Sequence, residues 1–203
     1  SVEMFNTTDI PKSSRIPKLV EALYAHMPVI ESARAKLITE SYKATEGQPT
    51  ITRRAEAFAH ILRNIPIIIR DNELIVGSST IAPRGCQTFP EFSYQWLEDE
   101  LDTVETRSAD PFYIAVGHVT VKYEEVLAIG YKGIIDKAQA ELDRCQVGDG
   151  NYVKKSHFLK AVILSCQAVI EYAERYAELA SQMAAECKTF GRIMRCCSFS
   201  TTC

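Results

Sequence analysis

Several features are missing from this 203-residue sequence, and each absence excludes a class of protein. No apolar run approaches the ~20 residues of a membrane-spanning helix. Ile65 to Ile69, for example, is short and contains Pro66. No basic segment followed by an apolar one lies at the N-terminus, so we expect no secretory signal. The formal net charge is only −3, which argues against a nucleic-acid partner bound through phosphate contacts. We therefore expect neither a membrane nor a nucleic-acid partner.

The seven cysteines lack any regular spacing, and no Cys-x-x-Cys pair occurs. Cys196, Cys197 and Cys203 have no histidine nearby in the sequence, so we expect no metal site. Several other cysteines fall at apolar helical positions, where cysteine behaves as a small hydrophobic residue. A reduced, cytoplasmic setting is the simplest interpretation.

What is present favours one folded, mainly α domain. Hydrophobic residues make up 46% of the chain and charged residues 24%, which is typical of a globular segment. Residues 1–15 are predicted to be a loose leader and 16–187 a helical domain. Periodicity is lost in residues 188–203, which we predict to be a separate tail.

Apolar residues at three- and four-residue intervals predict the helices of the N-terminal half. The first spans Ile16 to Met27 with a buried stripe, and Pro28 ends it. Ser32 is predicted to cap the second helix and Thr50 the third, which stops at Pro66. The residues of the stripe in the first helix are Leu19, Val20, Leu23 and Tyr24.

Two longer helices are predicted further on, at about 123–145 and 154–187. Gly130 and Gly133 weaken the middle of the first. Its apolar face comprises Val126, Leu127, Ile134, Ile135, Ala138 and Leu142. The stripe of the second comprises Phe158, Val162, Cys166, Val169, Ala173, Tyr176, Ala180 and Met183.

Little strand is expected. Residues 67–69 and 74–76, on either side of a turn at Asp71-Asn72, form either a small hairpin or two extended connectors. A modest helix is predicted at 94–105 and a short strand at 119–121.

Three ordered blocks of the sequence resemble one enzyme family. The first runs from Arg34 to Gly77 and includes RAKLITESYKATEGQP, NIPI and ELIVG. The second includes PR at 83–84, FPEFS at 89–93 and WLEDELD at 96–102. The third is VGHVTVKY at 116–123, with Lys122 where the family usually has an acidic residue. Together these blocks resemble the glycyl-radical enzymes, in the branch of coenzyme-B12-independent glycerol and propanediol dehydratases, near pyruvate formate-lyase.

The resemblance implies a fold and an activity. This chain would be the N-terminal helical shell of a ten-stranded α/β barrel that eliminates water from a small polyol, glycerol or propane-1,2-diol. The family's Gly-Cys-x-Glu and Arg-Val-x-Gly-Tyr motifs do not occur here, so no catalytic cysteine or radical glycine is assigned. We expect the chain alone to be inactive.

Two departures from the family pattern are visible. Several dozen residues, largely helical, normally separate the segment near Asp110 from the block at Val116, and here the two almost touch. The tail after Cys187 also stops resembling the family. Both features suggest an internally deleted, truncated or incorrectly assembled gene product, and the sequence alone leaves these alternatives open.

His118 is the one candidate site residue. The resemblance implies that it lies in the substrate pocket, binds a substrate hydroxyl and protonates it as water leaves. A histidine titrates near neutral pH and can donate that proton. The alternative is an ordinary hydrogen-bonded histidine at the start of a strand, and for this chain in isolation that alternative is favoured.

The resemblance also implies partners. No cofactor is expected to bind this chain, because the glycyl radical would be installed elsewhere by a radical-SAM iron–sulfur activating enzyme. The full-length protein would be a cytoplasmic homodimer in an anaerobe. Two other functions stay open: a non-catalytic helical remnant that binds a partner, and another lyase of the superfamily, either formate C-acetyltransferase-like or choline-cleaving.

Overall fold

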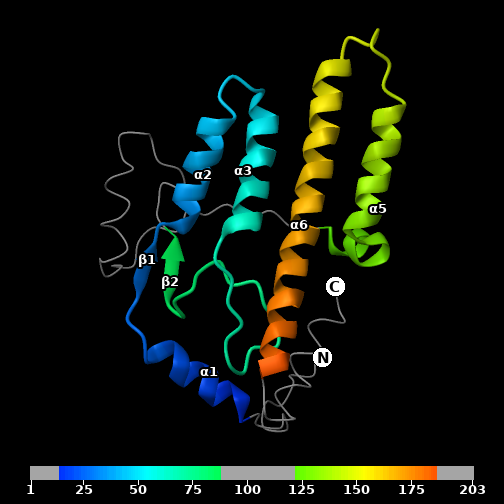
Figure 1. The fold of residues 1–203 in the computed structure, drawn as a ribbon. Coiled ribbons are helices and arrows are strands. Elements are labelled where there is room, and N and C mark those ends of the chain that lie inside the picture. The colour runs from blue at the N-terminus through cyan, green and yellow to red at the C-terminus, as the bar shows by residue number, and fades with distance from the viewer. Residues whose placement is uncertain (1–13, 88–121, 187–203) are drawn as a thin grey trace, which may run out of the picture.

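The computed structural model describes residues 14–87 and 122–186, and its four longest helices pack side by side in one bundle (Figure 1). In chain order the elements are α1 (Arg15–Tyr24), β1 (Val29–Glu31), α2 (Ala33–Ala44), α3 (Thr50–Asn64), β2 (Gly85–Gln87), α5 (Tyr123–Asp143) and α6 (Tyr152–Glu186). The expectation of a mainly helical chain is confirmed. The predicted helix at 94–105, the strand at 119–121, most of the leader and the tail lie outside the described residues.

The long helix α6 is the centre of the bundle, with α3 packed on one side and α5 on the other, and α2 covering α3 (Figure 1). Alanines are prominent among the buried residues of these two helices, with Ala55 and Ala59 in α3 and Ala161 and Ala168 in α6. Alanine faces allow the two helix backbones to approach closely, because little side-chain volume separates them.

The only sheet among the described residues joins β1 to β2 in parallel. Val29 is opposite Gly85, and Glu31 is opposite Gln87. Neither strand was predicted from the sequence, because three residues are too few to establish a period. Residues 67–69 and 74–76 are extended connectors rather than a hairpin, and Asn72 occupies the turn with a φ of 67°.

The predicted helix caps are partly wrong. Ser32 lies at the N-cap of α2 but makes no capping hydrogen bond through its side chain. Gln87 of β2 accepts a hydrogen bond from the Arg34 N–H at 3.2 Å, so a residue 53 positions away satisfies that helix end. Thr50 is the first residue of α3 and Pro49 its N-cap.

The predicted buried stripe of α1 is wrong. The helix forms, but none of its residues is buried, and Tyr24 is 70% exposed. Its long-range contacts include a hydrogen bond from the Arg15 guanidinium to the Asn72 carbonyl at 3.0 Å and the Tyr24 ring beneath Arg84. The stripe indicates the helix correctly, but no other described element packs extensively along it.

The predicted apolar faces of α5 and α6 are also partly wrong. Leu127 is 85% exposed and Phe158 is 54% exposed, although Ala138, Cys166, Tyr176 and Ala180 are buried as expected. The reason in α6 is its position between two helices. A helix covered on two sides buries two faces, so small residues such as Ala161 and Ala168 become core while Phe158 does not.

An ion pair between α3 and α6 predicts a pH dependence. Arg63 donates to both carboxylate oxygens of Glu171, the second at 3.1 Å, and this hydrogen bond lowers the pKa of Glu171. A lowered folded pKa means that the stabilisation is present above the ordinary glutamate pKa and is lost as pH falls through the folded value. Both side chains are partly exposed, so the effect is small. Urea unfolding from pH 6 to 3 should therefore show a shallower pH dependence for Glu171→Gln. An unchanged slope would contradict this assignment.

Candidate functional site

His118, the candidate predicted from the sequence, lies outside the described residues. The described chain resumes at Lys122, four residues beyond it, and enters α5 at once. On the other side the description ends with β2 at Gln87. The described residues on either side of 88–121 are therefore β2, which ends at Gln87, and the start of α5.

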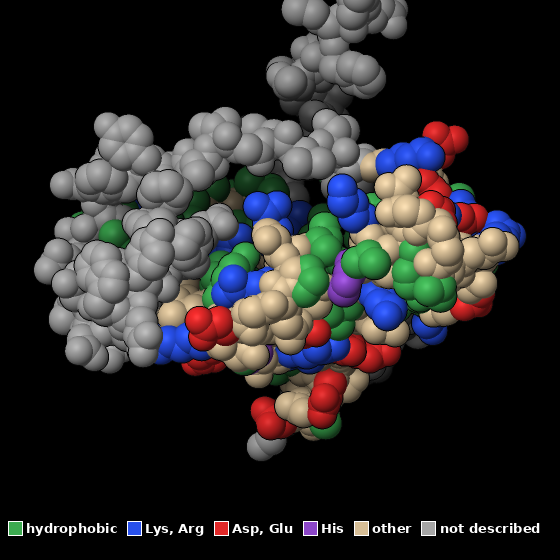
Figure 2. Space-filling model, turned by 90° about the horizontal axis from the view of Figure 1, so that it is seen from above, with side chains coloured by type: hydrophobic (Ala, Val, Ile, Leu, Met, Phe, Trp, Pro, Cys, Tyr) green, Lys and Arg blue, Asp and Glu red, His purple; other side chains and the backbone are tan. Residues whose placement is uncertain are grey.

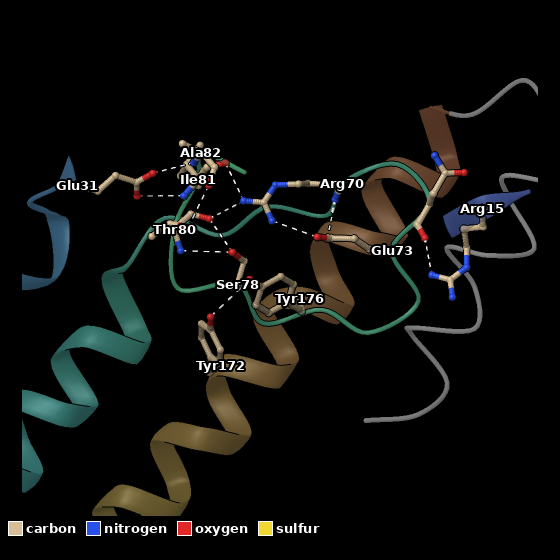
Figure 3. Close-up of polar contacts among 11 residues, drawn as sticks. Arg15, Glu31, Arg70, Glu73, Ser78, Thr80, Ile81, Ala82, Tyr172 and Tyr176 are labelled. Atoms are coloured by element: carbon tan, nitrogen blue, oxygen red, sulfur yellow. Dashed lines mark hydrogen bonds and ion pairs between the residues drawn. The ribbon is translucent and has the colours of Figure 1, made fainter. Parts of the chain in front are cut away.

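An anchor cluster of Glu31, Arg70, Glu73 and Thr80 fixes the loop between α3 and β2. The Arg70 guanidinium contacts the Glu73 carboxylate at 3.1 Å and donates to the carbonyls of Thr80 at 2.8 Å and Ile81 at 2.9 Å. The Glu73 carboxylate also accepts from the Arg70 N–H at 3.0 Å. Figure 3 shows Arg70 between Glu73 on one side and the 78–82 turn on the other.

Glu31 holds the same turn from the opposite side. Its carboxylate accepts hydrogen bonds from the N–H groups of Ile81 at 3.0 Å and Ala82 at 2.7 Å, as Figure 3 shows. Gly85 lies directly against it, because a Cβ at Gly85 would be 2.9 Å from Glu31 Oε1 and 2.7 Å from Thr80 Cβ. The turn thus has its carbonyls on Arg70 and its amides on Glu31.

The anchor cluster fixes the 78–82 turn, and the chain enters β2 three residues after that turn. Sequence reasoning missed it, although Arg70 lies within the first block that resembles the family and Glu31 only three residues before that block. The spacing of Arg70 and Glu73 around a turn was the available signal. The partner groups of Arg70 at residues 80 and 81 are backbone carbonyls, which no residue pattern reveals.

A second polar group of side chains lines a hollow of about 490 Å³ between α3 and α6. Thr52 Oγ1 lies 3.4 Å from His157 Nδ1, and Glu56 and Lys160 line the same hollow. Figure 2 shows the face seen from above Figure 1, where a histidine side chain lies among exposed hydrophobic and basic ones. Among the described residues no third side chain hydrogen-bonds the His157 ring to orient it as a base, so we assign no catalytic role to this pair.

Three other polar residues, Arg53, Arg84 and Cys86, have structural partners within the described chain. Arg53 stacks over the Tyr42 ring at 4.5 Å and donates to the Tyr42 carbonyl at 2.8 Å. Arg84 lies over the Tyr24 ring at 5.5 Å. Cys86 Sγ is 3.7 Å from the Val29 carbonyl. Arg53 and Arg84 thus each contact a tyrosine ring of the chain itself.

The buried Cys166 is not a candidate for a reactive thiol. Burial raises the pKa of the Cys166 thiol in α6, which disfavours the reactive thiolate. Within 14–87 and 122–186 no cluster of three or more His, Cys, Asp or Glu side chains has the geometry to hold a metal ion. None of the helices in these ranges combines the length and apolar character needed to cross a membrane.

Comparisons with known proteins identify the lineage. The family described as pyruvate formate lyase-like matches residues 7–116 and 113–194, two segments that meet at residues 113–116. A solved structure on 1,2-propanediol dehydration in Roseburia inulinivorans is 48% identical, with a TM-score of 0.81 over 94% of this chain and 30% of that one. The glycerol-bound B12-independent glycerol dehydratase from Clostridium butyricum is 38% identical, with a TM-score of 0.81 over 93% of this chain and 30% of that one.

A sequence comparison also matches this chain to part of a longer dehydratase. The (2S)-3-sulfopropanediol dehydratase of Klebsiella oxytoca is 27% identical over 224 residues, covering 84% of this chain and 27% of the relative. Because 84% of 203 residues is about 171, about 53 of the 224 aligned positions have no residue of this chain. The chain spans less than a third of the length of these relatives.

Proposed function

Because this chain belongs to the pyruvate formate lyase-like family, we propose that it forms the N-terminal helical part of a glycyl-radical dehydratase acting on a small polyol. The observation that carries the proposal is the 48% identity and 0.81 TM-score to the Roseburia protein over nearly the whole chain. Glycerol and propane-1,2-diol are the proposed substrates, since the two similar solved structures concern those polyols.

His118 is the proposed contribution of this chain to the chemistry. A hydroxyl is a poor leaving group, and it departs as water once a proton is supplied. A histidine with a pKa near neutrality can hold that proton and donate it at the moment of departure.

The rest of the machinery is proposed to lie in the longer protein. Its glycyl radical, installed by a radical-SAM iron–sulfur activating enzyme, supplies the hydrogen abstraction that starts the elimination. This chain's residues orient the substrate and exclude water from one wall of the pocket. The setting we propose is the cytoplasm of an anaerobe, because oxygen destroys such radicals. We also propose that the full-length protein is a homodimer.

The experiment has a genetic and a biochemical arm. The coding DNA is read across residues 108–120 and 187–203, and the uninterrupted gene is expressed anaerobically with its activating enzyme. We expect a glycyl-radical signal in electron paramagnetic resonance and conversion of propane-1,2-diol or glycerol to the aldehyde. The panel also contains 3-sulfopropanediol, choline and pyruvate, and exclusive turnover of one of these would replace the polyol assignment with that lyase.

Loss of the His118 imidazole predicts a specific kinetic change in that full-length enzyme. His118→Gln should lower kcat by about 10²- to 10⁴-fold, the usual contribution of a positioned acid, while the radical signal stays at its parent level. The 203-residue chain alone should give no turnover. Parent-level kcat in His118→Gln would remove the proposed role, and turnover by the chain alone would refute its dependence on the missing part.

One observation favours a second function. The exposed apolar side of α1, with Val20 and Tyr24 uncovered, is a surface that suits association with another polypeptide. If the gene has no continuation in any frame, a partner-binding helical remnant becomes the better proposal. Size-exclusion chromatography with light scattering on the 203-residue chain separates the two, since a remnant that uses this surface should purify with a partner.

A further inference from the structure

The first turns of α5 are bent away from the rest of the helix at Gly130 (Figure 1). Gly130 has a φ of 64° and a ψ of 177°, a region in which essentially only glycine lies. Gly133 completes the bend, because a Cβ there would be 2.7 Å from the Cβ of Ile129. Side chains four apart on an unbroken helix keep a wider separation, so the bent shape requires both glycines.

An ion-pair cluster joins the two sides of the bend. Glu125, before it, accepts hydrogen bonds from Lys137, after it, at 2.8 Å and from Lys122 at 2.9 Å. The contact between Glu125 and Lys137 exists only while the two parts of α5 are folded toward each other. All three side chains reach solvent, so this latch is weak and sensitive to salt.

The apolar pattern of the same helix fits a different shape. Eleven residues are about three full turns of an α-helix, so in an unbroken α5 Leu127 lies on the same side as Ala138. Ala138 is buried, and α5 packs against α6. In the bent form Leu127 is 85% exposed instead. The sequence therefore contains glycines and an ion pair that suit the bent form, and an apolar stripe that suits a straight one.

We propose that α5 is a two-state hinge: a bent form latched by Glu125 and Lys137 exchanges with a straight form in which Leu127 packs against α6. Conversion between the bent and straight forms changes the direction in which the chain enters α5 at Lys122. Anything that binds one form more tightly than the other shifts this equilibrium by its difference in affinity. The inference goes beyond the proposed function and depends only on residues 122–143 and α6.

Hydrogen–deuterium exchange of the 203-residue chain tests the hinge. Gly130→Ala and Gly133→Ala oppose the bend by different means, backbone conformation and steric clash. Each should slow exchange across residues 124–134, for Gly130→Ala by about four- to fivefold, from the helical preference of alanine over glycine. Glu125→Gln should slow it by up to about fivefold, since an exposed pair is lost. Glu124→Gln, its neighbour outside the latch, should change it less than about twofold.

A second substitution identifies the straight form itself. Leu127→Ser should leave exchange unchanged in the parent, where Leu127 faces solvent, but should reverse the protection gained in Gly130→Ala. Unchanged or faster exchange in both glycine variants overturns the proposal, because the bend would then be the only stable shape. An equal effect of Leu127→Ser in both backgrounds also overturns it, because Leu127 would then be covered in the bent form.

Discussion

Gly85→Ala should lower the free energy of unfolding by about 2–4 kcal/mol, the combined cost of overpacking and of displaced hydrogen bonds. The new Cβ would meet Thr80 Cβ at 2.7 Å and Glu31 Oε1 at 2.9 Å. Neither atom can move away from the new Cβ without a cost in stability. Thr80 Cβ is fixed to the backbone of the turn, and the Glu31 carboxylate accepts the amides of Ile81 and Ala82. The substitution therefore acts against the turn and the β1–β2 pair together.

Chemical denaturation with the midpoint followed by circular dichroism measures this effect. Thermal unfolding should shift down by about 4–16 °C, at roughly 2–4 °C per kcal/mol for a chain of this length. Gly148→Ala is the matched control, because a Cβ there has nothing within 4 Å and the residue has no positive φ. If both variants unfold at the same midpoint, Gly85 is not required by the anchor cluster and the description of that cluster fails.

The effect of Gly85 also shows where reasoning from the sequence reached its limit. The helices were predictable because a 3.6-residue period persists over many turns. The expected span of 154–187 for α6 differs from the observed one by one or two residues at each end. The β1–β2 pair was not predictable, since each strand has three residues and its partner is more than fifty positions away.

The apolar stripes predicted where helices form, but they did not predict which elements pack against those helices. A stripe shows that one side of α1 is hydrophobic, but what covers that side depends on other parts of the protein. In α6 the stripe predicted Phe158 as core, whereas coverage by both α3 and α5 moved the core toward the alanines. Period alone cannot distinguish a helix covered on one side from a helix covered on two.

One candidate site residue was predicted from the sequence, and two residues of the anchor cluster were not. His118 was found through three blocks that resemble the family, and its role stays a prediction, since the residue lies outside the described ranges. Glu31 and Arg70 were missed, because their function consists of contacts to backbone groups of residues 80–82. Backbone partners leave no trace in a residue pattern, so only the folded chain reveals them.

Arg175→Met should lower the free energy of unfolding by about 2–4 kcal/mol, since it removes two charge-assisted hydrogen bonds from partly buried acceptors. The guanidinium of Arg175 in α6 donates to the carbonyls of Leu62 at 2.6 Å and Ile65 at 2.8 Å. Those carbonyls belong to the C-terminal end of α3, where Pro66 prevents the helix from continuing. Methionine keeps most of the side-chain volume, so the loss reports the hydrogen bonds rather than a cavity.

Arg63→Met provides the matched comparison, because Arg63 also joins α3 to α6 but does so through the exposed Glu171 carboxylate. Its substitution should cost less than about 1 kcal/mol, the usual value of an exposed pair. Arg175→Lys should fall between the two, since one ammonium cannot take the place of a fork that reaches both carbonyls. Urea unfolding of the three variants at pH 7 ranks them. Equal costs for Arg175→Met and Arg63→Met would mean that the end of α3 does not depend on Arg175, and that α3 and α6 are held together by their alanine contacts alone.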